Sequence, residues 1–182
     1  MSMAVFLRVV WQHHRASKGS PTHNKVMLKL DNLVFRTASM QDRVALLKLE
    51  QKVIEAERPY NLSIRPRDAV YYDLDTLLTS EAAQVIVAEA EGLIIGTGYT
   101  QIRASKPSLK HTRHSYMGFM YVSPEYRGLG INKQIIDRLI DWSKQQGVMD
   151  FYLDVYAENE AAIRAYEKVG FAKSIVEMKI NL

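Results

Sequence analysis

A stretch in the second half of the chain carries the residue types that best fit ligand chemistry. It reads YVSPEYRGLGIN, spans residues 121–132, and follows a strongly apolar run. Gly128 and Gly130 let the backbone bend tightly, and Arg127 adds a cation that stays charged at any physiological pH. Because free backbone amides at the start of a helix attract anions, this stretch predicts a phosphate site, although a plain tight turn would use the same glycines.

The spacing of these glycines excludes two common nucleotide-binding motifs. A P-loop places Lys and then Ser or Thr after its last glycine, whereas Lys133 is followed by Gln134. A dinucleotide fingerprint requires a third glycine, which this stretch lacks. The sequence therefore calls for a phosphate-bearing ligand of another kind.

The elements that must position this stretch alternate between strand and helix patterns. Strand patterns cover residues 32–38, the two halves of 84–103 on either side of Glu91-Gly92, 114–122, 150–157 and 171–182. Helix patterns run from the capping pair Ser39 and Asp42 to just before Pro59, from Pro66 to Ser80, from Ile131 to Gly147, and from Asn159 to Gly170. This order predicts an α/β or α+β domain with one mixed, mostly antiparallel sheet of about six strands, flanked by about four helices.

Two separate motifs resemble those of the GNAT superfamily of acyl-CoA-dependent N-acyltransferases. The stretch YVSPEYRGLGIN is similar to the cofactor loop of that family. The stretch LDVYAENEAAIRAYEKVGF, residues 153–171, is similar to its second hallmark, a strand followed by Asn, a helix and Gly-Phe. The predicted element order agrees with the family fold from Leu33 to Leu182. The resemblance implies acetyl-CoA as co-substrate, no metal, and a cofactor arm lying between two central strands that splay apart.

The resemblance also implies roles for individual positions. The end of the central strand would pair with the pantetheine arm, and free amides there would polarise the thioester carbonyl. The loop backbone would hold the pyrophosphate, Asn159 would bond the cofactor arm, and Tyr166 would protonate the departing thiolate as general acid. The implied cofactor-binding residues are Met120, Tyr121, Val122, Arg127, Gly128, Leu129, Gly130, Ile131, Asn132, Asn159 and Tyr166.

Three of these residues also have other interpretations. Asn159 is a good N-cap for any helix, and Tyr166 lies on an apolar helical stripe where tyrosines often only pack. Asn132 departs from the family, which prefers Gly or Ala at that position. Its larger side chain would lie beside the diphosphate.

The sequence leaves the general base open. An amine must be neutral to attack a thioester, which requires a carboxylate, a histidine or a water relay near residues 114–122. That strand contains no acidic residue. The candidates are His114 at its start, Asp154 on the neighbouring strand and Glu89 in the hairpin, and the sequence prefers none of them.

The acceptor is open as well. The connections 57–66 and 103–114 would shape its site, and Tyr60, Tyr71 and Tyr72 would either line an aromatic pocket or pack in the core. We predict an N-acetyltransferase that passes the acetyl group of acetyl-CoA to a primary amine of a small molecule or peptide by direct attack in a ternary complex. The alternative is a non-catalytic acyl-CoA-binding or sensing domain.

Composition limits the remaining classes of function. A length of 182 residues with 47% hydrophobic content predicts one domain with a substantial core. The chain has no cysteine, which excludes disulfides, thiolate metal sites and a covalent cysteine intermediate. Charged residues interrupt every apolar run before it reaches the length needed to span a bilayer. This pattern predicts a soluble, cytoplasmic protein without membrane contacts. A homodimer is among the assemblies that the sequence allows.

The basic charge is concentrated at the start of the chain. The net charge is +4, but the first 30 residues hold five basic and no acidic residues, so the remainder is nearly neutral and no nucleic-acid partner is expected. We predict residues 1–31 to be a flexible basic leader and residues 32–182 to be the N-acetyltransferase domain. The leader also fits a targeting segment, or sequence upstream of a natural start at Met27.

Overall fold

The computed structural model describes residues 32–180, so the predicted leader lies outside the described residues. Five strands form one sheet: β1 Val34–Thr37, β2 Ala83–Ala90, β3 Leu93–Ala104, β4 Arg113–Val122 and β5 Phe151–Leu153. Neighbours in the sheet follow the chain order, and every pair is antiparallel except β4 and β5, which run parallel. Four α-helices accompany the sheet within the described part of the chain: α2 Arg43–Glu57, α3 Leu74–Thr79, α4 Ile131–Gln145 and α5 Glu160–Glu167.

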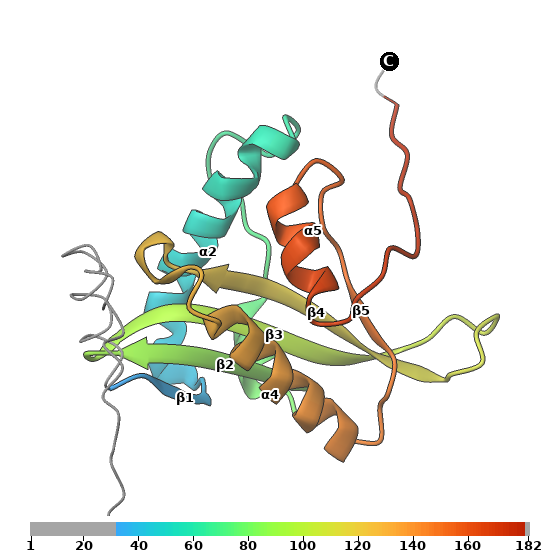
Figure 1. Ribbon diagram of the computed structural model, residues 1–182, viewed down its shortest axis with the longest axis horizontal. Helices are drawn as coiled ribbons and strands as arrows, with labels where there is room; N and C mark the ends of the chain where they lie inside the picture. The colour runs from blue at the N-terminus through green and yellow to red at the C-terminus, as the bar shows by residue number, and fades with distance from the viewer. Residues whose placement is uncertain (1–31, 181–182) are drawn as a thin grey trace, which may run out of the picture.

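The helices cover the two faces of the sheet in pairs. Helices α2 and α3 pack with one set of buried strand residues, including Val87 and Phe119, while α4 and α5 pack with the other, including Ile86 and Met117. Figure 1 shows α4 in front of the sheet and α2 passing behind it. This arrangement confirms the predicted fold class, a mixed and mostly antiparallel sheet flanked by helices.

The first helix begins as the sequence predicts. Ser39 and Asp42 form a capping box, in which the Ser39 side chain accepts a bond from a first-turn amide and Asp42 accepts from the Ser39 amide. The first turn is the 3-10 helix η1, Met40–Asp42, and α2 follows directly. Arg36 of β1 donates two bonds of 2.8 Å to Asp42, and this contact lowers the pKa of that carboxyl. The same ion pair therefore ties the start of the helix to the edge strand.

The second helix is shorter than predicted. Residues 61–73 form no regular helix after the 3-10 turn η2, Arg58–Tyr60, and α3 starts only at the N-cap Asp73. A helix over this segment would need the amides of Tyr71 and Tyr72 for its own carbonyls, but both donate to Glu50 Oε1, at 2.7 and 2.8 Å. Asp68 also adopts a left-handed backbone with φ of 54°. The buried Glu50 of α2 thus holds the Tyr71 and Tyr72 backbone in a non-helical form.

The hairpin and the central strand follow the prediction closely. Glu91 and Gly92 both have positive φ, 52° and 75°, which is the geometry of a tight two-residue turn between β2 and β3. Strand β4 then runs beside β3 to Val122, and α4 begins at Ile131 as predicted. Its residues Ile131, Ile135 and Leu139 are fully or almost fully buried against the sheet.

The end of the chain differs from the prediction. Strand β5 covers three residues of the predicted 150–157, and residues 172–180 form no strand, so the sheet of the described residues has five strands where about six are predicted. An alternating apolar pattern makes a strand only where a sheet edge pairs with it. Within the described residues no backbone hydrogen bond joins this segment to the sheet, and Val176 and Met178 are more than four-fifths exposed. In Figure 1 the segment leaves α5 and runs away from the sheet.

The role of Glu50 leads to a test of fold stability. Glu50→Ala leaves the Tyr71 and Tyr72 amides without their acceptor, and we expect the free energy of unfolding to fall by about 2–4 kcal/mol, since each unsatisfied amide costs about 1–3 kcal/mol. Urea unfolding followed by circular dichroism measures this loss. Glu50→Gln keeps an acceptor oxygen at the same place and should lose clearly less. Equal stability of Glu50→Ala and the wild type would contradict this role.

Candidate active site

Strands β4 and β5 stay together for only a short distance. Their register joins residues 115–117 of β4 to 151–153 of β5, and beyond Met117 β4 continues without a partner on that side among the described residues. We call residues 118–122 the open edge of β4. Ser123 donates to Ile95 of β3, at 2.8 Å, so by the alternation of amides along a strand Val122 and Met120 direct their amides to the open edge. These are two of the residues predicted to bind the cofactor arm.

A bulge shapes the open edge. The register of β3 and β4 shifts between Thr97 and Tyr99, and Phe119 has a positive φ of 55°, which is unusual for an aromatic residue. The Phe119 amide therefore leaves the ladder and donates to the Tyr72 hydroxyl, at 3.2 Å. Gly98 lies across from the bulge, and a Cβ there would come within 2.6 Å of the Met120 sulfur. The bulge and a glycine together make room for Met120 at this point.

The predicted phosphate loop lies at the end of the open edge. Gly128 and Gly130 have φ of 79° and 77°, and nothing lies within 4 Å of where a Cβ would be, so the backbone conformation requires these glycines and the surface above them is open. Gly130 is the N-cap of α4, and no side chain caps the first amides of that helix. Arg127 donates through Nε to the Val122 carbonyl, at 3.0 Å, which fixes its guanidinium beside the loop. This arrangement suits an anion.

The N-terminus of α4 also contains the unusual Asn132. It is the second residue of the helix and is half-buried. Its backbone amide belongs to the uncapped first turn, so the change from Gly or Ala keeps the amide and adds a side chain next to it.

Helix α5 positions the other two predicted residues. Asn159 is its N-cap, and its Oδ1 accepts a bond from the Ala162 amide at 3.2 Å, which leaves the Nδ2 group for a ligand. Tyr166 is half-buried in the cluster between α4, α5 and the sheet, and burial, followed by the charge of Glu57, raises its pKa to about 12. The phenol therefore keeps its proton throughout the physiological pH range, as a general acid must.

The three predicted bases occupy different places. Asp154 follows β5 directly, is exposed, and accepts a bond of 2.7 Å from the hydroxyl of Tyr116 on β4. His114 lies just before the three residues of β4 that pair with β5, at the end away from the open edge. It is bonded to Ser105 at 2.9 Å, and burial lowers its pKa. Glu89 lies on β2, three strands away from β5, and forms an ion pair with Arg36 of β1. Only Asp154 lies beside the open edge of β4.

Further side chains lie with Asp154 on the face covered by α2. Tyr116 carries the bond to Asp154, and Arg103 stacks over its ring with the guanidinium carbon 3.8 Å from the ring centroid. Tyr156 accepts a bond from Asn61 at 3.0 Å. Glu57, at the end of α2, raises the pKa of Tyr166 across the sheet. The alternating pattern of the predicted strand 150–157 places Tyr156 on the same face as Asp154, whereas no sequence pattern points to Glu57.

With this geometry described, the chain can be compared with known proteins. Residues 50–171 match the model of a family described as the acetyltransferase (GNAT) family. The chain belongs to this family. The resemblance of its loop and of its C-terminal motif to the GNAT superfamily is thereby confirmed.

Relatives and solved structures agree with this GNAT membership. A probable N-acetyltransferase of Xenopus tropicalis, camello, is 33% identical over 105 residues, which are 58% of this chain and 46% of that protein. The ribosomal protein bS18-alanine N-acetyltransferase of Escherichia coli is 36% identical over 55 residues, or 30% of this chain and 37% of that protein. The chain thus spans less than half the length of these relatives. A predicted acetyltransferase from Clostridium acetobutylicum, solved with acetyl-CoA, has the same fold, with a TM-score of 0.66 at 23% identity over 82% of this chain and 96% of its own.

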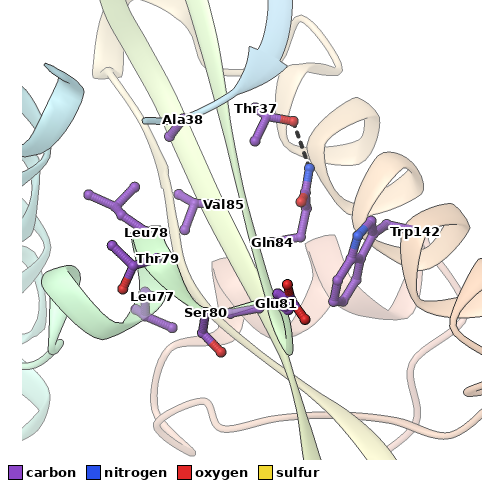
Figure 2. A pocket seen from close by; sticks show the side chains of 11 residues that line it. Thr37, Ala38, Leu77, Leu78, Thr79, Ser80, Glu81, Gln84, Val85 and Trp142 are labelled. Carbon is purple, nitrogen blue, oxygen red and sulfur yellow. Dashed lines mark hydrogen bonds between the residues drawn. The ribbon is translucent and has the colours of Figure 1, made fainter. Parts of the chain in front are cut away.

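A cavity of about 350 Å³ lies away from the site of this GNAT chain. It opens beyond the end of β1, and Figure 2 shows Trp142 of α4 on one side and the end of α3 on the other. Gln84 donates to Thr37 at its wall, at 2.7 Å. None of its lining residues comes from β4, β5, α5 or the glycine loop, so we assign it no part in acyl transfer.

Two other kinds of site receive no support in residues 32–180. No group of three His, Asp or Glu side chains there could hold a metal ion. Among the same residues, none of the helices combines the length and apolarity needed to cross a bilayer.

The position of Arg127 predicts its effect on cofactor affinity. Arg127→Gln removes the cation beside the loop, and we expect acetyl-CoA to bind about 10–100-fold more weakly, because a hydrogen bond to a charged group contributes about 1.5–3 kcal/mol. Titration calorimetry measures the change. The matched control is Arg138→Gln, the same charge change further along α4, where the arginine stacks over Phe35; it should change the affinity less than twofold. Equal effects of the two variants would show that Arg127 acts only through net charge.

Proposed function

We propose that this chain is an N-acetyltransferase that transfers the acetyl group of acetyl-CoA to a primary amine by direct attack in a ternary complex. The observation that supports this best is the set of groups around the open edge of β4. The glycine loop lies at its end, Tyr166 lies on the face covered by α4 and α5, and Asp154 lies on the face covered by α2. An acyl donor bound along the edge would have its thioester between a proton donor and a carboxylate.

Each group has a defined task in this proposal. The first amides of α4 and the Arg127 guanidinium bind the pyrophosphate, and Asn159 Nδ2 donates to the cofactor arm. The Met120 and Val122 amides pair with that arm along the open edge and stabilise the negative charge that develops on the thioester oxygen. Acetyl-CoA supplies the activated acetyl group, while the protein supplies orientation and proton transfer.

The protons and bonds balance as follows. A carboxylate on the α2 face takes one proton from the acceptor ammonium, and Asp154 is the sequence candidate on that face. The neutral nitrogen attacks the carbonyl carbon, the C–N bond forms and the C–S bond breaks. Tyr166 gives its phenolic proton to the thiolate, and the second proton lost by the nitrogen restores the phenol. One proton is released in total.

A thiol-release assay over a panel of amines tests the proposed function. The panel contains amino acids, polyamines, aminoglycosides and peptide N-termini, and the absence of cysteine from the chain removes any background from the protein itself. Release that depends on one class of amine supports the proposal. Acetyl-CoA binding in calorimetry without release by any amine would favour the sensing domain instead, and absence of binding would refute both functions.

Tyr166 gives a second, independent prediction. Tyr166→Phe keeps the ring but removes the proton donor, so we expect kcat to fall at least about 100-fold while the Kd for acetyl-CoA changes little. Because the pKa of Tyr166 is raised to about 12, the phenol stays protonated at pH 10, and wild-type kcat should not decline up to that pH. An alkaline decline centred near pH 9, or full activity of Tyr166→Phe, would argue against this role.

A further inference from the structure

Glu57 is a carboxylate that has no cationic partner among the described residues. It is the last residue of α2, it is half-buried, and no ion pair within residues 32–180 includes it. The neighbouring Arg58 does not neutralise it, because that guanidinium bonds Glu55 and the Arg65 carbonyl. Burial of an anion without a partner is costly, so such a site favours an incoming cation.

Tyr71 presents an unpartnered hydroxyl in the same place. Its oxygen is buried, yet it makes no hydrogen bond to any described residue. After burial itself, the charge of Glu57 is the largest influence that raises its pKa, and Tyr156 contributes as well. Both side chains therefore lie close to this hydroxyl, although neither makes a hydrogen bond of good geometry with it. A buried hydroxyl in this state has capacity for a bound ligand.

The groups around Glu57 are held in place by contacts with other residues of the protein. The Tyr156 ring stacks on Tyr60 with centroids 6.1 Å apart, and its hydroxyl accepts from Asn61. Glu50 holds the backbone of Tyr71. The Asn61–Tyr156 bond joins the segment after α2 to the segment before α5, two elements that lie at the same end of the molecule in Figure 1. These contacts make the position rigid before any ligand binds.

Glu57 is also close to the reacting groups. Its charge is the second cause, after burial, of the raised pKa of Tyr166, and it likewise raises the pKa of Tyr72, whose hydroxyl accepts from the bulge amide of Phe119. Glu57 and Tyr166 come from helices on opposite faces of the sheet, so this interaction passes where β4 and β5 have separated. An amine on Glu57 would therefore face the thioester.

We propose that Glu57, Tyr71 and Tyr156 form the acceptor site, which binds a primary amine in its alkylammonium form, and that Glu57 is the carboxylate that removes its proton. This inference rests on the proposed function. The ammonium donates to the Glu57 carboxylate and to the Tyr71 oxygen, while the ring of Tyr156 covers the alkyl part. Asp154, which is exposed and already accepts from Tyr116, then positions that tyrosine rather than the substrate.

The groups facing Glu57 define the expected pH dependence. They are phenols from three segments: Tyr71 and Tyr72 before α3, Tyr156 after β5 and Tyr166 on α5. Burial raises the pKa of Tyr71, Tyr72 and Tyr166, so these three stay uncharged near neutral pH. Burial raises the pKa of Glu57 above its ordinary value. Since the ionised form binds the ammonium, kcat/KM should rise with pH through this raised pKa, and this acid limb should depend on Glu57.

The test compares three carboxylate variants with an amine that the panel identifies as a substrate. Glu57→Gln should lower kcat/KM at least 100-fold at pH 7, lose the acid limb, and recover partly near the pKa of the amine, where free base is abundant. Its Kd for acetyl-CoA should be unchanged. Asp154→Asn tests the other candidate base and should fall less than tenfold with the acid limb intact. The matched control is Glu55→Gln, the same change at an exposed carboxylate of α2, and it should leave kcat/KM and the acid limb unchanged. A reversed pattern, or an unchanged Glu57→Gln, would overturn the assignment of Glu57 and leave the proposed function standing.

Tyr71→Phe provides a second test. Its readout is the binding of the amine, which would not change if the hydroxyl had only a structural role. Removing a buried hydroxyl without a partner should leave the urea midpoint equal or higher, whereas the KM for the amine should rise about fivefold or more. Calorimetry with the amine and unacetylated CoA measures binding without turnover, and Glu57→Gln should weaken it by the same order as its KM. Unchanged KM and amine affinity in both variants would refute the site. A wild-type protein that binds no amine would refute this site together with the proposed function.

Discussion

Strand β5 pairs with β4 over three residues, and the backbone of β4 that follows is left without a partner within a well-packed region. Tyr121 and Val122 are 7% and 9% exposed, so water reaches this edge only in part. A buried amide without an acceptor costs about 1–3 kcal/mol, which makes the open edge a strong site for an extended ligand with carbonyl groups. The cofactor arm of the GNAT family has this form. The glycine loop at the end of the same edge then fixes where the anionic part of the ligand lies.

The separation of β4 and β5 also connects the two faces of the sheet. Elsewhere the paired strands isolate the cluster under α2 and α3 from the cluster under α4 and α5. Beyond Met117 this barrier ends, and a carboxylate on α2 influences a phenol on α5. Two substrates can therefore approach from opposite faces and meet at one point. In the proposed function, this geometry allows direct transfer without a covalent intermediate on the protein, and the chain has no cysteine to form one.

Local patterns predicted most of the fold, including the positions of the glycine loop and of α5. The capping box at Ser39, the Glu91-Gly92 turn and the start of α4 depend on neighbouring residues only, and all three were predicted. The short α3 was not, because Tyr71 and Tyr72 give their amides to Glu50, which lies far back in the sequence. The predicted sixth strand, residues 171–182, does not form within the described residues for a related reason. Its alternating pattern makes a strand only where a sheet edge pairs with it, and no described strand does so. The proposed acceptor site had no sequence signal either, because Glu57, Tyr71 and Tyr156 come from three separate segments that only the fold brings together.

Glu50 links stability to the chemistry of the site. Its Oε1 fixes the backbone of Tyr71 and Tyr72, and Tyr72 in turn accepts from Phe119 at the bulge of the open edge. These hydrogen bonds therefore connect the interior of α2 with the segment of Tyr71 and Tyr72, and this segment with β4, the strand proposed to bind the acyl donor. The other carboxylate oxygen of Glu50 is buried without a hydrogen-bond partner, which lowers the stability of the fold. In return, the segment that carries Tyr71 is held rigidly. If side-chain packing alone held this segment, the Tyr71 hydroxyl could move away from Glu57.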